Sequence, residues 1–118
     1  VTGVQTCALP ILMESIADQH GYTVAKEYVG HGIGKTLHER PQLPAWGKPG
    51  TGEKLMEGMV ICIEAQLIDG DNELYTAEDG WTVKTVDGSK AVMFEFMVLV
   101  GKDKATFLTP TMDWPLVV

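Results

Sequence analysis

Two apolar stretches decide the fold of this chain: MVICIEAQLI at residues 59–68 and AVMFEFMVLV at residues 91–100. The first is rich in β-branched residues and lies between Gly58 and Gly70, and the second combines three valines with two phenylalanines. Short apolar runs of this kind are typical of buried strands. The second run is only about half the roughly 20 residues that a membrane-spanning helix needs. The sequence therefore predicts two core strands and no membrane span.

The segments around these strands predict one helix and several shorter elements. LMESIADQH at residues 12–20 places apolar side chains on one face, and Gly21 follows as a helix cap. YTVAKEYV at residues 22–29 predicts a strand that leads into a glycine-framed loop, GHGIG, at residues 30–34. Further strands are expected at residues 81–86 and 105–109, and an irregular surface loop is expected at the proline- and glycine-rich residues 40–54. The sum is an α+β fold, one helix packed on a mostly antiparallel sheet.

Length and charge narrow the classes of protein to which the chain can belong. Its 118 residues, 45% of them hydrophobic and 21% charged, suit a single folded domain. The net charge of −7 repels phosphate backbones and anionic membrane surfaces, so neither nucleic acid nor a membrane is expected as a partner. Two cysteines, Cys7 and Cys62, fit neither a disulfide framework nor a cysteine-based zinc cluster. A reducing, cytoplasmic location is expected.

The first eleven residues, VTGVQTCALPI, stand apart from the rest of the chain. They have no basic flank and no A-x-A-like cleavage site, so they do not form a signal peptide. The string resembles the conceptual translation of a sequencing-library adapter. We therefore predict that residues 1–11 are an artefact and that residues 12–118 belong to the natural protein. The alternative is an ordinary apolar strand or loop.

Two carboxylates and two histidines are the candidates for chemistry. Glu64 and Glu95 are each the only charge in an apolar run. A buried carboxylate must be neutralised, paired or bound to a cation, and two of them suggest a shared cation. His31 and His38 lie seven residues apart around the glycine-framed loop, and imidazole with carboxylate suits a divalent transition metal. The alternatives are carboxylates that point outward from a half-exposed sheet and histidines with a structural role.

Four motifs carry a resemblance to a known family. In order and spacing they resemble the type I methionine aminopeptidases, which have the pita-bread metallopeptidase fold: GHGIGKTLHERPQ (30–42), EGMVICIEAQL (57–67), EDGWTVKTVDGS (78–89) and MFEFMVLV (93–100). GHGIG and GMV-x-x-IE also occur in proline-directed relatives such as aminopeptidase P and prolidase, whereas DGWTVKT is more specific. Met93 stands where the proline-directed relatives usually have arginine, which favours the methionine-type branch.

The resemblance implies roles for individual residues. The chain would be the carboxy-terminal half of a pita-bread fold. His31, Glu64 and Glu95 would bind two divalent metal ions (Co, Mn, Fe or Zn), with Glu95 bridging both. Glu64 would also accept a proton from the attacking water. His38 would hydrogen-bond the substrate carbonyl and steady the tetrahedral intermediate.

The same resemblance assigns a substrate pocket and an activity. Leu37 and Trp81 would form walls of the pocket for the methionine side chain, or they are ordinary core residues. The intact parent protein would be a metalloaminopeptidase that removes the N-terminal methionine from nascent proteins, with the ribosome as a candidate partner. The family's two aspartate ligands lie upstream of everything matched here, so the fragment alone is expected to be inactive.

Three positions near the implied ligands depart from the family's pattern. Ala65 and Gln66 stand where the family has Pro-Met, and Phe96 stands where it usually has histidine. Such neighbours of ligands affect metal preference. Two alternatives stay open: a non-catalytic pita-bread binding module, and a proline-directed aminopeptidase of the same fold.

Overall fold

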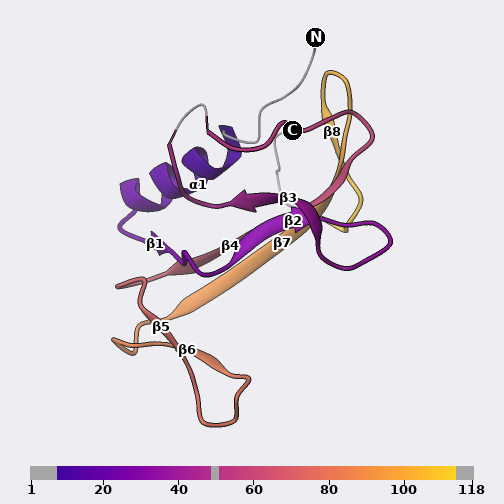
Figure 1. The fold of residues 1–118 in the computed structure, drawn as a ribbon. Helices are drawn as coiled ribbons and strands as arrows, with labels where there is room; N and C mark the ends of the chain where they lie inside the picture. The colour runs from indigo at the N-terminus through magenta and orange to yellow at the C-terminus, as the bar shows by residue number, and fades with distance from the viewer. Residues whose placement is uncertain (1–7, 49–50, 114–118) are drawn as a thin grey trace.

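The structure is a computed structural model that describes residues 8–48 and 51–113. One helix precedes eight strands: α1 (Ala8–Gln19), β1 (Thr23–Val24), β2 (Val29–Gly32), β3 (Glu39–Pro44), β4 (Val60–Ile68), β5 (Leu74–Thr76), β6 (Val83–Thr85), β7 (Ala91–Val100) and β8 (Ala105–Phe107) (Figure 1). The predicted α+β class is confirmed. Among the described residues, no helix has the length and apolar character needed to cross a membrane.

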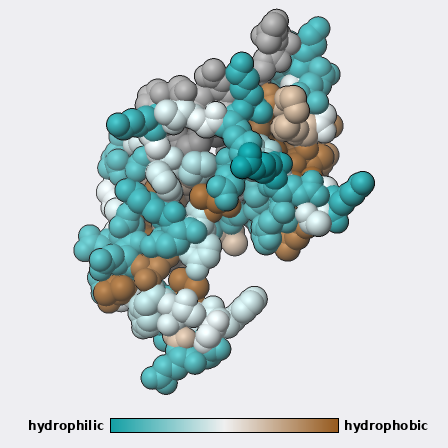
Figure 2. Space-filling view, in the orientation of Figure 1, coloured by the Kyte–Doolittle hydropathy of each residue, from teal (hydrophilic) through white to brown (hydrophobic). Residues whose placement is uncertain are grey.

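The main sheet has the strand order β3-β2-β4-β7-β8, and β1 also pairs with β4. Every strand pair that the described residues form is antiparallel. Strands β4 and β7 pair over their whole length, from Val60 opposite Leu99 to Ile68 opposite Ala91, and form the long diagonal ribbon of Figure 1. Strands β5 and β6 form a separate hairpin, the lobe at the bottom of the space-filling view (Figure 2). The β4–β7 pair thus forms the central part of the main sheet.

The helix and the candidate site residues lie on opposite faces of the β4–β7 pair. Side chains alternate between the two faces of a strand, and directly opposed residues of neighbouring strands share a face. Ile63, opposite Phe96, and Ala65, opposite Phe94, face α1 and border an apolar cavity of about 390 Å³ beside the helix. Glu64, opposite Glu95, belongs to the other face. One face of the sheet therefore packs toward the helix, while the other face carries the two carboxylates.

Two clusters of buried side chains hold the layers together. In the first, Ala17 of the helix packs with Val24 and Ala45. The second lies at the other end of the sheet and consists of Leu43, Leu55, Ile61, Val98 and Val100. Burial of a branched side chain of this kind contributes about 1.5 to 3 kcal/mol. The core therefore depends on β4 and β7, the two strands that the apolar runs predicted.

The helix ends as the sequence predicted, although it begins earlier. Gly21 adopts a φ of 77°, in the left-handed region that favours glycine. The Tyr22 amide donates to the Ala17 carbonyl at 2.9 Å, and the Gly21 amide donates to the Asp18 carbonyl at 3.1 Å. This pair of bonds is a Schellman cap. The helix starts at Ala8, within residues 1–11, and the predicted artefactual origin of that segment stays a prediction.

Two predictions about loops are wrong. Residues 40–54 were expected to be irregular, yet β3 reaches Pro44 and pairs with β2. Strand β3 lies at the edge of the sheet, where the missing amide of a proline disrupts no ladder. The expected loop at residues 30–34 begins as β2, so His31 lies in a strand. An added Cβ at Gly30 or Gly32 would collide with the backbone of a neighbouring strand, which explains both glycines.

The shorter strands match their predictions in part. The expected strand at residues 22–29 pairs only at Thr23–Val24 before the chain enters β2. Strand β6 occupies Val83–Thr85 of the predicted residues 81–86, and β8 occupies Ala105–Phe107 of the predicted residues 105–109. The strand at Leu74–Thr76 was not predicted. Strand β7 has the predicted bounds.

Candidate metal centre

Three neighbouring strands place the candidate ligands on one face of the sheet. His31 of β2 lies directly opposite Cys62 of β4, and Glu64 of β4 lies directly opposite Glu95 of β7. Cys62 and Glu64 are two residues apart in one strand, so they share a face. Directly opposed side chains start about 4.5 to 5.5 Å apart at Cβ. The register of the sheet alone therefore gathers an imidazole, a thiol and two carboxylates.

The His31 ring is oriented for a ligand on its Nε2 side. Its Nδ1 lies 2.9 Å from the Gly32 carbonyl oxygen. A carbonyl only accepts hydrogen bonds, so Nδ1 carries the proton and the Nε2 of the neutral ring keeps its lone pair. Nε2 lies 3.8 Å from Glu64 Oε1, and the two side chains are only 9% and 14% exposed. Two electron-rich atoms that face each other across this gap suit a cation between them.

Glu64 and Glu95 differ in exposure. Glu64 is half-buried and accepts a hydrogen bond from Gln66 Nε2 at 3.2 Å. Glu95 is exposed, so the expectation that both carboxylates are buried is wrong for Glu95. Residues 91–95 are all exposed, on both faces of β7, so this end of the strand lies at the surface of the described chain. The two carboxylates still share a face, as their position in the paired strands requires.

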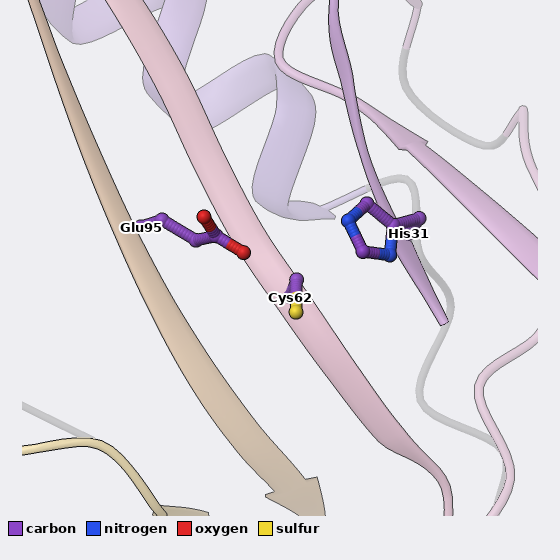
Figure 3. A group of neighbouring side chains, drawn as sticks. All are labelled: His31, Cys62 and Glu95. Carbon is purple, nitrogen blue, oxygen red and sulfur yellow. The ribbon is translucent and has the colours of Figure 1, made fainter. Parts of the chain in front are cut away.

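Cys62 is the residue that sequence reasoning missed. One donor atom from each of His31, Cys62 and Glu95 lies within 4.8 Å of the other two. Figure 3 shows the His31 ring and the Glu95 carboxylate pointing toward Cys62 from either side. The two-residue spacing between Cys62 and Glu64, which puts both on one face of a strand, was the signal in the sequence that could have identified Cys62. Cys7, the other cysteine, lies outside the described residues.

The surroundings of Cys62 keep its thiol protonated. Burial raises the pKa of Cys62 to about 11, and the hydrogen bond to Glu95 and the charges of Glu95 and Glu64 act in the same direction. The carboxylates thus concentrate negative charge at this point of the sheet, and a bound cation would reverse their effect on the thiol.

His38 joins the site from the loop between β2 and β3. Its ring centroid lies 4.4 Å from that of His31, with an interplanar angle of 70°. The loop is held by Glu39, whose carboxylate accepts hydrogen bonds from the Thr36 amide at 2.8 Å and the Thr36 hydroxyl at 3.1 Å. These bonds lower the pKa of Glu39 below its usual value. A cavity of about 450 Å³ is bordered by both histidines, so the exposed His38 side chain faces space that a ligand can enter.

Leu37 and Trp81 do not line the cavity beside the histidines. Their exposed fractions are 66% and 88%, so neither is a core residue of the described chain. Trp81 lies in the turn between β5 and β6. The Asp79 carboxylate holds this turn by accepting hydrogen bonds from the Trp81 amide at 2.9 Å and the Thr82 amide at 2.8 Å. A hydrogen bond from the Thr82 hydroxyl contributes most to lowering the pKa of Asp79, and the two amide bonds act in the same direction.

The chain resembles methionine aminopeptidases in sequence and in structure. It is 38% identical over 109 residues to methionine aminopeptidase from Mycoplasma capricolum subsp. capricolum, which covers 92% of this chain and 43% of that protein. Methionine aminopeptidase 1 from Bacillus subtilis is 39% identical over 97 residues, 82% of this chain and 39% of that protein. The chain thus spans about two-fifths of the length of these curated relatives.

Solved structures and a family model agree with these relatives. The crystal structure of methionine aminopeptidase from Thermotoga maritima matches with a TM-score of 0.87 and 39% identity, over 91% of this chain and 43% of that one. The enzyme from Rickettsia prowazekii matches with a TM-score of 0.85 and 34% identity, over 90% of this chain and 43% of that one. The expected fold, part of a pita-bread structure, is confirmed. The model of metallopeptidase family M24 matches residues 1–102. The chain belongs to metallopeptidase family M24.

Proposed function

We propose that the complete protein is a methionine aminopeptidase whose metal centre is built in part by this chain. One observation carries the proposal: Glu64 lies opposite Glu95 on the face toward which the His31 Nε2 lone pair points. The names of the matched relatives support the choice of methionine aminopeptidase within the family. The substrate is then the N-terminal methionine of nascent polypeptides, in the cytoplasm, with the ribosome as a candidate partner.

In this proposal His31, Glu64 and Glu95 would hold two divalent ions. The donors are one imidazole and two carboxylates, a set that suits Co, Mn, Fe or Zn. When bound, such ions lower the pKa of water and polarise the peptide carbonyl. Two ions need more ligands than these three residues supply, and the family resemblance implies two aspartates, outside this chain, that complete the centre. The 118-residue chain alone is therefore inactive.

Three polar side chains of the site have a part in the proposed reaction. Glu64, which is half-buried beside His31, accepts a proton from the attacking water and returns it to the leaving amine. His38 donates a hydrogen bond to the substrate carbonyl oxygen, where negative charge develops in the transition state. Its place beside the cavity of about 450 Å³ gives it access to the substrate. Gln66 holds Glu64 through the bond at 3.2 Å.

The exposed apolar surface supports the view that more of the protein covers this sheet. Ile16 of the helix is 48% exposed, and Val92 and Phe94 of β7 are 48% and 41% exposed. Contiguous exposed apolar side chains mark surfaces that pack against other protein. We propose that the remainder of the complete protein covers this face, and that the missing aspartates reach Glu95 on the opposite face of the sheet.

The complete gene product, recovered by sequencing upstream of the codon for Leu12, tests the proposed activity. With added manganese or cobalt it is expected to release methionine from a Met-Ala-Ser peptide and to lose this activity when a chelator removes the metal. It should leave an X-Pro peptide intact, since a proline-directed enzyme would cleave that peptide instead. No hydrolysis of either peptide by the folded, metal-loaded protein would favour a non-catalytic binding module.

Trp81 provides a test of the methionine pocket. We propose that Trp81 and Leu37 form walls of this pocket, which fits their exposure in the described chain. Trp81→Ala is expected to raise KM for Met-Ala-Ser about ten-fold with a smaller effect on kcat, because it removes apolar contact with the methionine side chain. The matched control is Tyr75→Ala, which truncates another exposed aromatic residue of the same hairpin. Equal effects of the two substitutions would remove Trp81 from the pocket.

A further inference from the structure

One donor in the cluster has no part in the proposed reaction. We propose that the Cys62 thiolate is itself a ligand of the metal centre, which gives the centre a sulfur donor and a preference for a thiophilic cation such as zinc or cobalt over manganese. This inference rests on the proposed function, because it concerns the same centre. It adds a donor that the histidine and the two carboxylates do not provide.

The sheet places Cys62 among the candidate metal ligands. It is directly opposite His31 and two residues from Glu64 on the same face. The donor atoms of His31, Cys62 and Glu95 lie within 4.8 Å of one another. A tetrahedral ion with a metal–sulfur bond of about 2.3 Å and a metal–nitrogen bond of about 2.0 Å holds its donors about 3.5 Å apart. The donors thus need to close by about an ångström, and the exposed Glu95 side chain and the Cys62 χ1 torsion can supply this movement.

The charge of the cluster favours a cation that binds sulfur. Cys62 is buried, two residues from Glu64 in β4, and its sulfur lies within 4.8 Å of a Glu95 oxygen and a His31 ring nitrogen. A cation there faces two carboxylates and the Cys62 sulfur, which would bind it as a thiolate. In that step the sulfur–hydrogen bond is replaced by a sulfur–metal bond, and the proton leaves to solvent. Thiolate ligands select zinc over manganese, which prefers oxygen.

A simpler role for Cys62 is to donate a hydrogen bond to Glu95 and so orient that carboxylate. This role predicts no sulfur in the coordination sphere, so spectroscopy separates the two. The experiment uses the complete protein in which every cysteine except Cys62 is replaced by serine. Loaded with cobalt, this protein should show an intense near-ultraviolet band from thiolate-to-cobalt charge transfer. Loaded with zinc, it should show a sulfur scatterer at about 2.3 Å in X-ray absorption.

Replacement of Cys62 supplies the second arm of the test. Cys62→Ser should abolish the charge-transfer band, retain the weaker visible bands of bound cobalt, and reduce the preference for zinc over manganese at least about ten-fold. The X-ray absorption measurement needs only the protein with Cys62 in place, so it decides the matter even if Cys62→Ser does not fold. A band that persists in Cys62→Ser would not come from this thiolate and would overturn the inference.

The remaining outcomes separate this inference from the proposed function. If the protein binds metal and hydrolyses Met-Ala-Ser but shows no sulfur signal, Cys62 is not a ligand. The proposed aminopeptidase activity is then still supported. A sulfur signal in a folded protein that hydrolyses no peptide supports Cys62 as a ligand and contradicts the proposed activity.

Discussion

Glu64→Gln in the complete protein is expected to lower kcat/KM for Met-Ala-Ser by at least about a thousand-fold. General base catalysis alone contributes about 100- to 10,000-fold, and the amide is also a poorer metal ligand than the carboxylate. Gln has nearly the same shape as Glu and can still accept the hydrogen bond from Gln66 Nε2, so the strand should keep its conformation. Steady-state kinetics together with metal analysis of the purified variant measures the effect.

The matched control is Glu57→Gln, which removes the same charge from an exposed position three residues before β4. Its kcat/KM should stay within about two-fold of the unmodified protein, since surface charges far from the reaction have small effects. If Glu64→Gln retained most of the activity with the metal still bound, Glu64 could not be the proton acceptor.

Gly30→Ala is expected to reduce the free energy of unfolding by about 2 to 3 kcal/mol, the effect of forcing extra atoms into a packed interior. An added Cβ would lie 2.5 Å from the Cys62 carbonyl oxygen in β4 and 3.2 Å from the Leu43 Cβ in β3. Strands β4 and β3 lie close to Gly30 on either side, so the clash can be relieved only if one of these strands moves. His31 follows directly, and its displacement should also weaken metal binding.

Denaturant unfolding of the complete protein measures this loss of stability. Gly34→Ala is the matched control because its added Cβ would meet only the Glu39 side chain, which is exposed and can move. Its stability should change by less than about 1 kcal/mol. Equal losses in the two variants would show that the close approach of the strands at Gly30 is not what requires glycine there.

The parts of the fold that sequence predicted are those with an uninterrupted pattern. Strand β7 has the predicted bounds, Ala91–Val100, because its apolar run is broken only by Glu95. Gly21 marked the helix end because few other residues adopt its φ of 77°. These signals are local, so they do not depend on which strands become neighbours.

The errors arose where tertiary position overrides local composition. Pro41 and Pro44 suggested a loop, but their place in an edge strand makes them harmless. Gly30 and Gly32 suggested a flexible loop around His31, whereas close strand packing requires them. The sequence could not reveal strand order, so it could not reveal that these residues lie beside β4 and β3.

The candidate site was predicted only where each residue stood out by its own charge or motif. Glu64 and Glu95 were conspicuous as single charges in apolar runs, and the structure places them opposite each other. Cys62 was judged by the number of cysteines rather than by its face of the strand, so its convergence with His31 and Glu95 was missed. The exposure of Glu95 depends on what covers β7, which no local pattern reports.

The antiparallel ladder that pairs Glu64 with Glu95 also ties the chemistry to the alignment of two strands. Because side chains alternate, sliding β7 by one residue against β4 would turn Glu95 toward the helix and put Phe94 or Phe96 in its place. An insertion or deletion between the two strands that caused such a slip would exchange the packing surface and the reactive surface in one step. Insertions in the intervening β5–β6 hairpin are therefore tolerated only if they preserve the alignment of β4 with β7.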